Sequence, residues 1–117
     1  MKVNYAPLRQ LSGYIASALI DAESGMVLSK DEAAPFNIEL ASALNAEVLK
    51  SKRSAVEALQ LGDDVEDILI TLGKQYHLIR PVENNPQLFL YLAIDRKRGS
   101  LAMARMALKE VEQSIAA

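Results

Sequence analysis

His77 is the only histidine of this 117-residue chain, and the chain has no cysteine. Serine hydrolysis needs a base held against its nucleophile, and the sequence has no Gly-x-Ser-x-Gly elbow that would present such a serine. A zinc site needs several His or Cys ligands, so a single histidine is not enough. We therefore expect His77 to be a surface or partly packed strand residue without a catalytic role.

Acidic residues gather at one point of the sequence, in Asp63, Asp64, Glu66 and Asp67. Paired carboxylates can transfer protons or bind a hard cation. However, the Asp-x-Asp-x-Asp-Gly pattern of a calcium loop is absent. The preferred interpretation is a solvated loop leading into an edge strand, where charge discourages aggregation. No metal and no cofactor is predicted.

Two short basic groups could contact an acidic partner or a phosphate: Lys50–Arg53 and Arg96–Arg98. The second group precedes a predicted helix, whose first backbone N–H groups favour anions. Short charge clusters are usually solvated surface, which is the favoured interpretation of both. Neither a Gly-x-x-x-x-Gly-Lys-Ser/Thr loop nor a Gly-x-Gly-x-x-Gly motif occurs, so nucleotide hydrolysis by this chain is not predicted.

The overall composition is that of an ordinary globular protein, with 50% hydrophobic and 24% charged residues. We expect one domain over residues 1–117. The net charge of −2 argues against a nucleic-acid partner. The N-terminal residues lack the apolar region of a signal peptide, and no apolar run is long enough to cross a bilayer. A soluble, cytoplasmic protein without membrane insertion is the expectation.

Turn signals divide the chain into strands and helices. The expected strands cover 13–21, 26–29, 65–72, 76–82 and 88–94. The expected turns and connections are Glu23–Gly25, 30–34, Gly73–Lys74 and 83–86. The run 88–94 is apolar on both faces, as in a central strand that is covered on both sides.

Two helices are predicted, over 36–59 and from Ser100 to about 115. The first has one apolar face, formed by Phe36, Leu40, Leu44 and Val48. The second has a core-facing stripe, formed by Leu101, Ala104, Leu108, Val111 and Ile115. Met103 and Met106 are expected to fill the core, and Arg105, Lys109, Glu112 and Gln113 to face water.

The resulting order is β-β-α-β-β-β-α, preceded by at most a short turn over Pro7–Leu11. It predicts an α+β fold with a five-stranded, mostly antiparallel sheet and helices on opposite faces, because one helix cannot cover both faces.

This order and two motifs resemble the roadblock family, named after a dynein light chain, as a bacterial-type small single-domain member. Gly13–Leu28 resembles the opening hairpin: a glycine, a small-and-apolar strand, an acidic turn that ends in glycine and an apolar return. Leu88–Asp95 followed by Ser100–Arg105 resembles the last strand and the start of the last helix.

Two positions and one element depart from the family pattern. Ser100 stands where Asn is usual, and Ala102 stands where Gly is usual. Family members also begin with a helix of several turns, whereas only Pro7–Leu11 precede Gly13 here. The short first helix is expected to leave part of one sheet face less covered.

The resemblance implies a protein-binding module without enzyme activity. Relatives are small homodimers or heterodimers that act as scaffolds and as regulators of Ras-like GTPases. Their dimers pair an edge strand across a two-fold axis and pack the middle helices together. Carried over, the dimer interface would contain Leu40, Leu44, Val48, Ile68, Ile70 and Leu72. Hypothetical contacts to a further partner are Arg96, Lys97, Arg98 and Arg105.

Two other hypotheses remain open at the level of sequence. A small-molecule sensing domain of profilin-like or PAS-like architecture would have a cavity lined by residues such as Tyr14, Phe89 and Tyr91. A subunit that heterodimerises with a longer relative would be poorly soluble when it is expressed alone.

Overall fold

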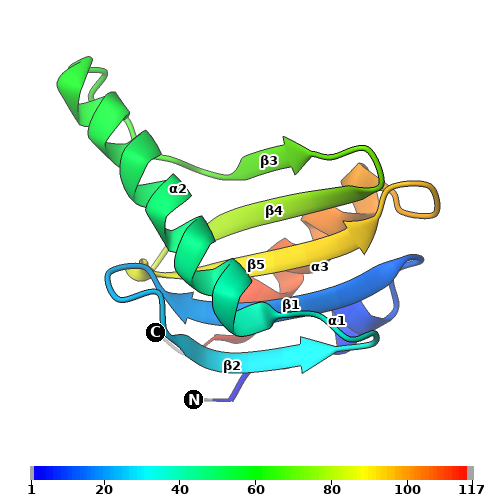
Figure 1. Cartoon of the computed structure of the whole chain (residues 1–117). Helices are drawn as coiled ribbons and strands as arrows, with labels where there is room; N and C mark the ends of the chain where they lie inside the picture. The colour runs from blue at the N-terminus through cyan, green and yellow to red at the C-terminus, as the bar shows by residue number, and fades with distance from the viewer. Residues whose placement is uncertain (1, 116–117) are drawn as a thin grey trace.

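The computed structural model describes residues 2–115 and contains one five-stranded sheet, with strand order β2-β1-β5-β4-β3 (Figure 1). All neighbouring strands are antiparallel. The strands are β1 (Tyr14–Asp21), β2 (Val27–Glu32), β3 (Ile68–Thr71), β4 (Gln75–Val82) and β5 (Asn85–Asp95). The helices are α1 (Ala6–Arg9), α2 (Ile38–Ala58) and α3 (Leu101–Ser114). The predicted α+β fold and its element order are confirmed.

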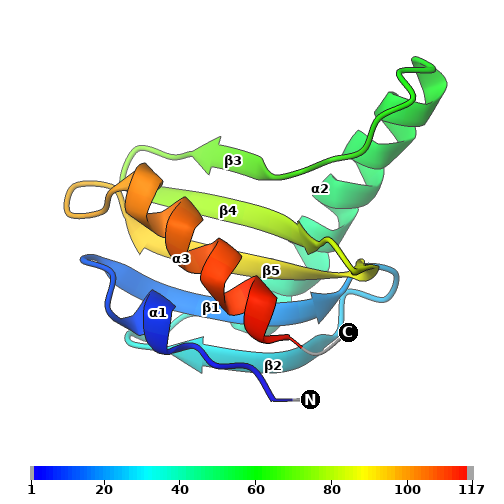
Figure 2. The ribbon, with the colours of Figure 1, turned by 180° about the vertical axis from the view of Figure 1, so that it is seen from behind.

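The helices lie on opposite faces of the sheet, with α2 on one face and α1 and α3 on the other (Figures 1 and 2). The sheet has one hydrophobic core on each face, and the side chains of β5 alternate between the two cores, as expected for a central strand. Leu90 and Leu92 are buried on the α3 side, whereas Phe89 and Tyr91 are buried on the α2 side. This arrangement explains why the whole strand is apolar.

Helix α1 is a single turn, in line with the short N-terminal segment. It packs against α3 and β1, and Leu8 is fully buried there together with the ring of Tyr5. These two residues join the core on the α3 side of the sheet, so they contribute to covering the face of which part was expected to be less covered.

Local chemistry explains where the long helices begin. The side chain of Asn37 accepts a hydrogen bond from Leu40 N–H at 3.1 Å, and Ser100 Oγ accepts one from Met103 N–H at 3.3 Å. Both side chains satisfy donors of a first helical turn. Gly25 ends the first hairpin turn with φ +76, and a Cβ there would stand 3.0 Å from Ala43 Cα. The turn therefore needs glycine for its backbone and for its contact with α2.

The lengths of three strands differ from the prediction. β2 continues to Glu32, so residues 30–32 of the predicted polar connection are strand, paired with β1 up to Ala16↔Glu32. β5 begins at Asn85, inside the predicted turn, because its backbone pairs with Val82. β3 is four residues long, because residues 65–67 and Leu72 of the predicted strand do not join the ladder. Asp64 Oδ1 instead accepts the hydrogen of Val65 N–H at 2.8 Å.

Helix α3 buries its predicted stripe, but three of its residues lie on the side opposite to the prediction. Glu112 is buried rather than wet: it accepts hydrogen bonds from Arg80 Nε and from Glu83 N–H. Met103 and Met106 are exposed rather than in the core. A buried carboxylate is tolerated here because a guanidinium and a backbone N–H satisfy it.

Candidate protein–protein interface

Strand β3 forms one end of the sheet and is the first part of the candidate interface. It pairs with β4 alone, so its outer edge has no neighbouring strand in the part of the chain that the structure describes. Its sequence, Ile68-Leu69-Ile70-Thr71, has no charged residue. Ile68 and Ile70 lie partly buried on the α2 side of the sheet. An uncharged open edge favours pairing with another strand.

The opposite end of the sheet is chemically different. Strand β2 carries Lys30, Asp31 and Glu32 in succession. Arg9 binds Asp31 at 2.6 Å, and Lys30 binds Glu39 at 2.9 Å, so these charges are also engaged in ion pairs. Charged side chains on an edge strand oppose pairing with a second sheet. Of the two edges, β3 is therefore the one suited to association.

Helix α2 supplies the second part, a strip of exposed apolar side chains. Leu40, Leu44 and Val48 are 55%, 58% and 39% exposed. They lie four residues apart and therefore on one side of the helix. The side that packs on the sheet is made by other residues, Ile38, Ser42, Asn45, Ala46 and Leu49. Of the predicted apolar face, Leu40, Leu44 and Val48 are thus left to solvent in the single chain, whereas Phe36 lies before the helix and packs on the α2-side core.

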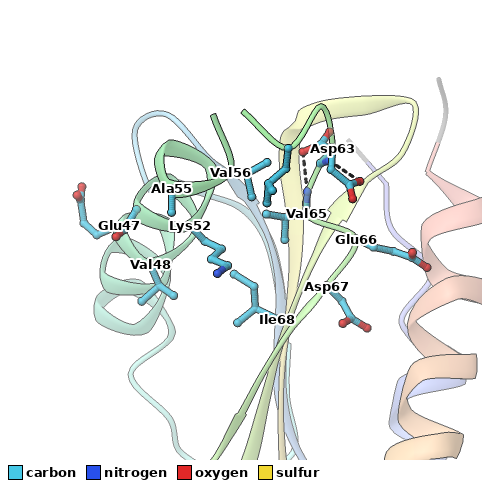
Figure 3. A pocket seen from close by; sticks show the side chains of 13 residues that line it. Glu47, Val48, Lys52, Ala55, Val56, Asp63, Val65, Glu66, Asp67 and Ile68 are labelled. Carbon is cyan, nitrogen blue, oxygen red and sulfur yellow. Dashed lines mark hydrogen bonds between the residues drawn. The ribbon is translucent and has the colours of Figure 1, made fainter. Parts of the chain in front are cut away.

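A groove of about 770 Å³ connects the helix strip to the β3 edge (Figure 3). Val48, Ala55 and Val56 line it from α2, Val65 lines it from the segment that leads into β3, and Ile68 lines it from β3 itself. Acidic side chains, Glu47, Asp63, Asp64, Glu66 and Asp67, also line it. The α2 strip, the groove and the outer edge of β3 together form one surface, hereafter the α2–β3 surface.

The second half of α2 extends beyond the sheet. The helix has 21 residues and is therefore about 32 Å long, whereas five strands span about 19 Å. Its first half packs over the sheet and comes closest to β1 and β2, whereas its C-terminal end projects past β3 (Figure 1). Leu59 and Leu61, just after the helix, are exposed. The projecting end is therefore followed by exposed apolar side chains beyond the edge of the sheet.

The predicted partner-contact cations are largely used within the fold. Arg105 Nε donates to Asp67 Oδ2 at 3.0 Å, and Arg98 Nε donates to Asp95 Oδ2 at 3.0 Å. Arg96 Nη1 donates to the Leu72 carbonyl at 3.1 Å, while the side chain of Lys97 is exposed. The structure brings Arg96 and Arg105 to the two ends of β3, a placement that the sequence did not reveal.

His77 lies next to this surface and is partly buried, as predicted. Its ring meets Phe36 and Tyr91 edge-on, at centroid distances of 6.1 and 5.5 Å. Nε2 faces Gln75 Oε1 at 2.7 Å, and Nδ1 faces the Tyr91 hydroxyl at 3.0 Å. Burial lowers the pKa of His77 below its usual value. The ring acts as a packing element of the α2-side core.

The cavity expected of a small-molecule sensor is not formed by the residues named for it. Phe89 and Tyr91 are fully buried on the α2 side of the sheet, whereas Tyr14 belongs to the core on the α3 side. Residues on opposite faces of a sheet cannot line one cavity. The prediction of a site lined by all three is therefore wrong.

The acidic segment is a loop with local contacts. Asp63 and Asp64 each accept a hydrogen bond from the next backbone N–H, both at 2.8 Å. Asp67 is paired with Arg105. Within residues 2–115, no group of three or more His, Asp or Glu side chains is placed to hold a metal ion. Among the same residues, none of the helices has the length and apolar character required to span a bilayer.

Several solved structures are similar to this chain. A roadblock/LC7 domain from Streptomyces avermitilis matches with a TM-score of 0.81 and 17% identity, over 92% of this chain and 87% of that one. MglB in a tetrameric arrangement matches with a TM-score of 0.78 and 18% identity, over 92% and 78%. The gliding protein MglB of Thermus thermophilus matches with a TM-score of 0.72 and 21% identity, over 92% and 78%.

Comparison of the sequence with protein-family models finds no match, and neither does comparison with curated proteins. The likeness to the solved structures establishes the fold of this chain, which is the roadblock fold.

Proposed function

We propose that this chain of roadblock fold is a homodimeric protein-binding module without enzyme activity, which regulates or scaffolds a Ras-like GTPase. The observation that supports self-association is the α2–β3 surface. It combines an uncharged open strand edge with exposed apolar residues on the same side of the sheet. An open apolar edge is an aggregation hazard unless something covers it.

A second copy of the chain fits this surface because a two-fold axis can satisfy all of its parts together. Pairing two β3 strands across the axis would continue the sheet from one copy into the other. The end of α2 that projects past β3 would then lie over the sheet of the second copy. In an isologous contact the same patch is used on both copies, so the Leu44 and Val48 strip of each α2 would face the second copy. The tetrameric arrangement of the similar protein MglB supports self-association of this fold.

The GTPase part of the proposal is supported by the resemblance of two sequence motifs to roadblock proteins, in Gly13–Leu28 and Leu88–Arg105. The sequence has no phosphate-binding Gly-rich loop of its own. A nucleotide would accordingly be bound by the partner, and the role of this chain would be to hold or modulate that partner.

Molar mass in solution tests the homodimer. We expect light scattering at micromolar concentration to give twice the chain mass of 12.8 kDa. Leu44→Glu and Ile70→Lys should each reduce the mass to that of one chain, because a charge would be buried at the contact. Met106→Glu is the matched control, since Met106 is exposed on the other face and should leave the dimer intact.

A monomeric wild-type chain would overturn the homodimer. Wild-type mass in both Leu44→Glu and Ile70→Lys would show that a different surface is used. Poor solubility that is cured by co-expression with a longer relative would replace the homodimer by a heterodimer on the same surface.

The GTPase is tested separately, by affinity capture from the source cells in the presence of GDP or of a non-hydrolysable GTP analogue. We expect mass spectrometry to identify a Ras-like GTPase whose recovery depends on the nucleotide. Leu44→Glu serves as a second bait, which shows whether the partner needs the dimer. Absence of any GTPase from both nucleotide conditions would contradict this part of the proposal.

A further inference from the structure

Two arginines from the segment around the start of α3 contact both ends of the edge strand β3. Arg105 donates from Nε to Asp67 Oδ2 at 3.0 Å, immediately before β3 begins. Arg96 donates from Nη1 to the carbonyl oxygen of Leu72 at 3.1 Å, immediately after β3 ends. The four residues of β3 are therefore fixed at each flank by a cation that comes from outside the β3–β4 hairpin.

Arg96 is itself held in place by two further contacts. Its guanidinium carbon lies 5.6 Å from the centre of the Tyr76 ring, in a cation–π geometry. Its backbone N–H donates to the Lys74 carbonyl at 2.9 Å, in the turn between β3 and β4. Tyr76 pairs with Thr71, the last residue of β3. The side chain that reaches Leu72 is thus positioned by the same hairpin that it restrains.

The strand needs such restraint because it is short and lies at an edge. β3 has four ladder positions with β4, and its residues are partly or fully exposed. Short strands at a sheet edge open locally at a small free-energy cost. Docking of another strand requires the extended conformation, so each local opening reduces the population able to pair.

Because these contacts of the two arginines are at least partly exposed, they contribute more to the position of β3 than to the overall stability of the fold. The side chains of Arg105 and Asp67 are 42% and 26% exposed, and ion pairs of this kind add little to the free energy of folding. Self-association is more sensitive, because both copies must have β3 in place. If the competent fraction of each copy is halved, the apparent Kd rises about fourfold.

We infer that Arg96 and Arg105 are positioning residues for self-association, which hold the edge strand β3 ready to pair with a second copy of the chain. This inference rests on the proposed homodimer. It makes the geometry of the dimer edge depend on residues of another element, the α3 segment, which lies on the opposite face from α2.

The dissociation constant of the dimer, measured by sedimentation equilibrium, tests the inference. The variants are Arg96→Gln, Arg105→Gln and the double variant, and Arg9→Gln is the control. Arg9 forms the same kind of ion pair, with Asp31 at 2.6 Å, but next to the other edge strand. We expect the double variant to raise the Kd about fourfold or more, the control to leave it within about twofold, and Arg105→Lys to recover part of the loss.

A second measurement separates positioning from direct contact with the partner copy. In the monomeric Leu44→Glu background, the double variant should still increase the amide exchange rates of residues 68–71, whereas Arg9→Gln should not. Unchanged exchange there, or a dimer Kd equal to that of the control, would overturn the inference and leave the homodimer standing. A wild-type chain that is monomeric throughout would overturn both.

Discussion

At the scale of single residues, the fold disfavours the charged form of His77. Its ring lies between Phe36 and Tyr91, and burial is the cause that lowers its pKa. With Gln75 Oε1 facing Nε2, the neutral ring donates from Nε2 and accepts the Tyr91 hydroxyl hydrogen at Nδ1. A second proton on Nδ1 would reverse the direction of that hydrogen bond and place a charge in a buried position, and no carboxylate contacts the ring among the described residues.

The free energy of unfolding is therefore expected to fall as the pH decreases below about 6.5, the usual pKa of histidine. In that range the unfolded chain binds the proton more readily than the folded chain, which destabilises the fold. Urea unfolding at a series of pH values from about 8 down to about 5 should show a larger loss for the wild type than for His77→Gln. Carboxylates titrate in both proteins and cancel in the comparison, so parallel curves would contradict the role given to His77.

Substitution of Glu112 tests whether its buried contacts stabilise the fold. Glu112→Ala should lower the free energy of unfolding by about 3 kcal/mol, because it leaves the Arg80 guanidinium and the Glu83 N–H without their acceptor. Glu110→Ala is the control on the exposed side of α3 and should change it by less than about 0.5 kcal/mol. Chemical denaturation of the wild type and of both variants measures these free energies of unfolding. Equal losses in the two variants would refute the argument.

At the scale of elements, α2 shows which features the sequence predicts and which it does not. Periodicity locates the helix and its apolar strip, because large apolar residues recur every fourth position. Which side packs on its own sheet is not readable from periodicity, since the buried side includes Ser42 and Asn45. The family resemblance, and not the pattern, suggests that Leu44 belongs to an interface.

Strand ends and single polar residues escape prediction for a different reason. The extension of β2 to Glu32 depends on backbone pairing with β1, which charged side chains on an edge strand do not signal. The burial of Glu112 depends on Arg80, which is 32 residues away in the sequence. Long-range pairs of this kind leave no local trace, whereas the cap at Ser100 and the central strand β5 are encoded locally and are predicted.

The N-cap of α3 gives a prediction at this scale. Ser100→Ala should cost about 1 kcal/mol of the free energy of unfolding, because the N–H of Met103 loses its acceptor. Ser100→Asp keeps an acceptor and adds a negative charge at the helix N-terminus, so it should retain the stability. Thermal unfolding of both variants provides the measurement, and a loss of equal size in Ser100→Asp would exclude capping as the cause.

At the scale of the whole molecule, stability and association are linked in the proposed dimer. Anything that binds the folded chain alone raises its apparent stability by mass action. We therefore expect the Tm to rise by a few degrees when the protein concentration is increased about a hundredfold. Leu44→Glu should unfold at a Tm that does not depend on concentration. A wild-type Tm that is equally insensitive would argue against a dimer in this range.

The unequal edges of the sheet also determine how far assembly can proceed. Joining two copies through β3 leaves β2 at each outer border of the combined sheet, where Lys30 and Glu32 are exposed and resist a further strand. Growth would then stop after one round, so the same chain that is built to pair is also protected from forming filaments.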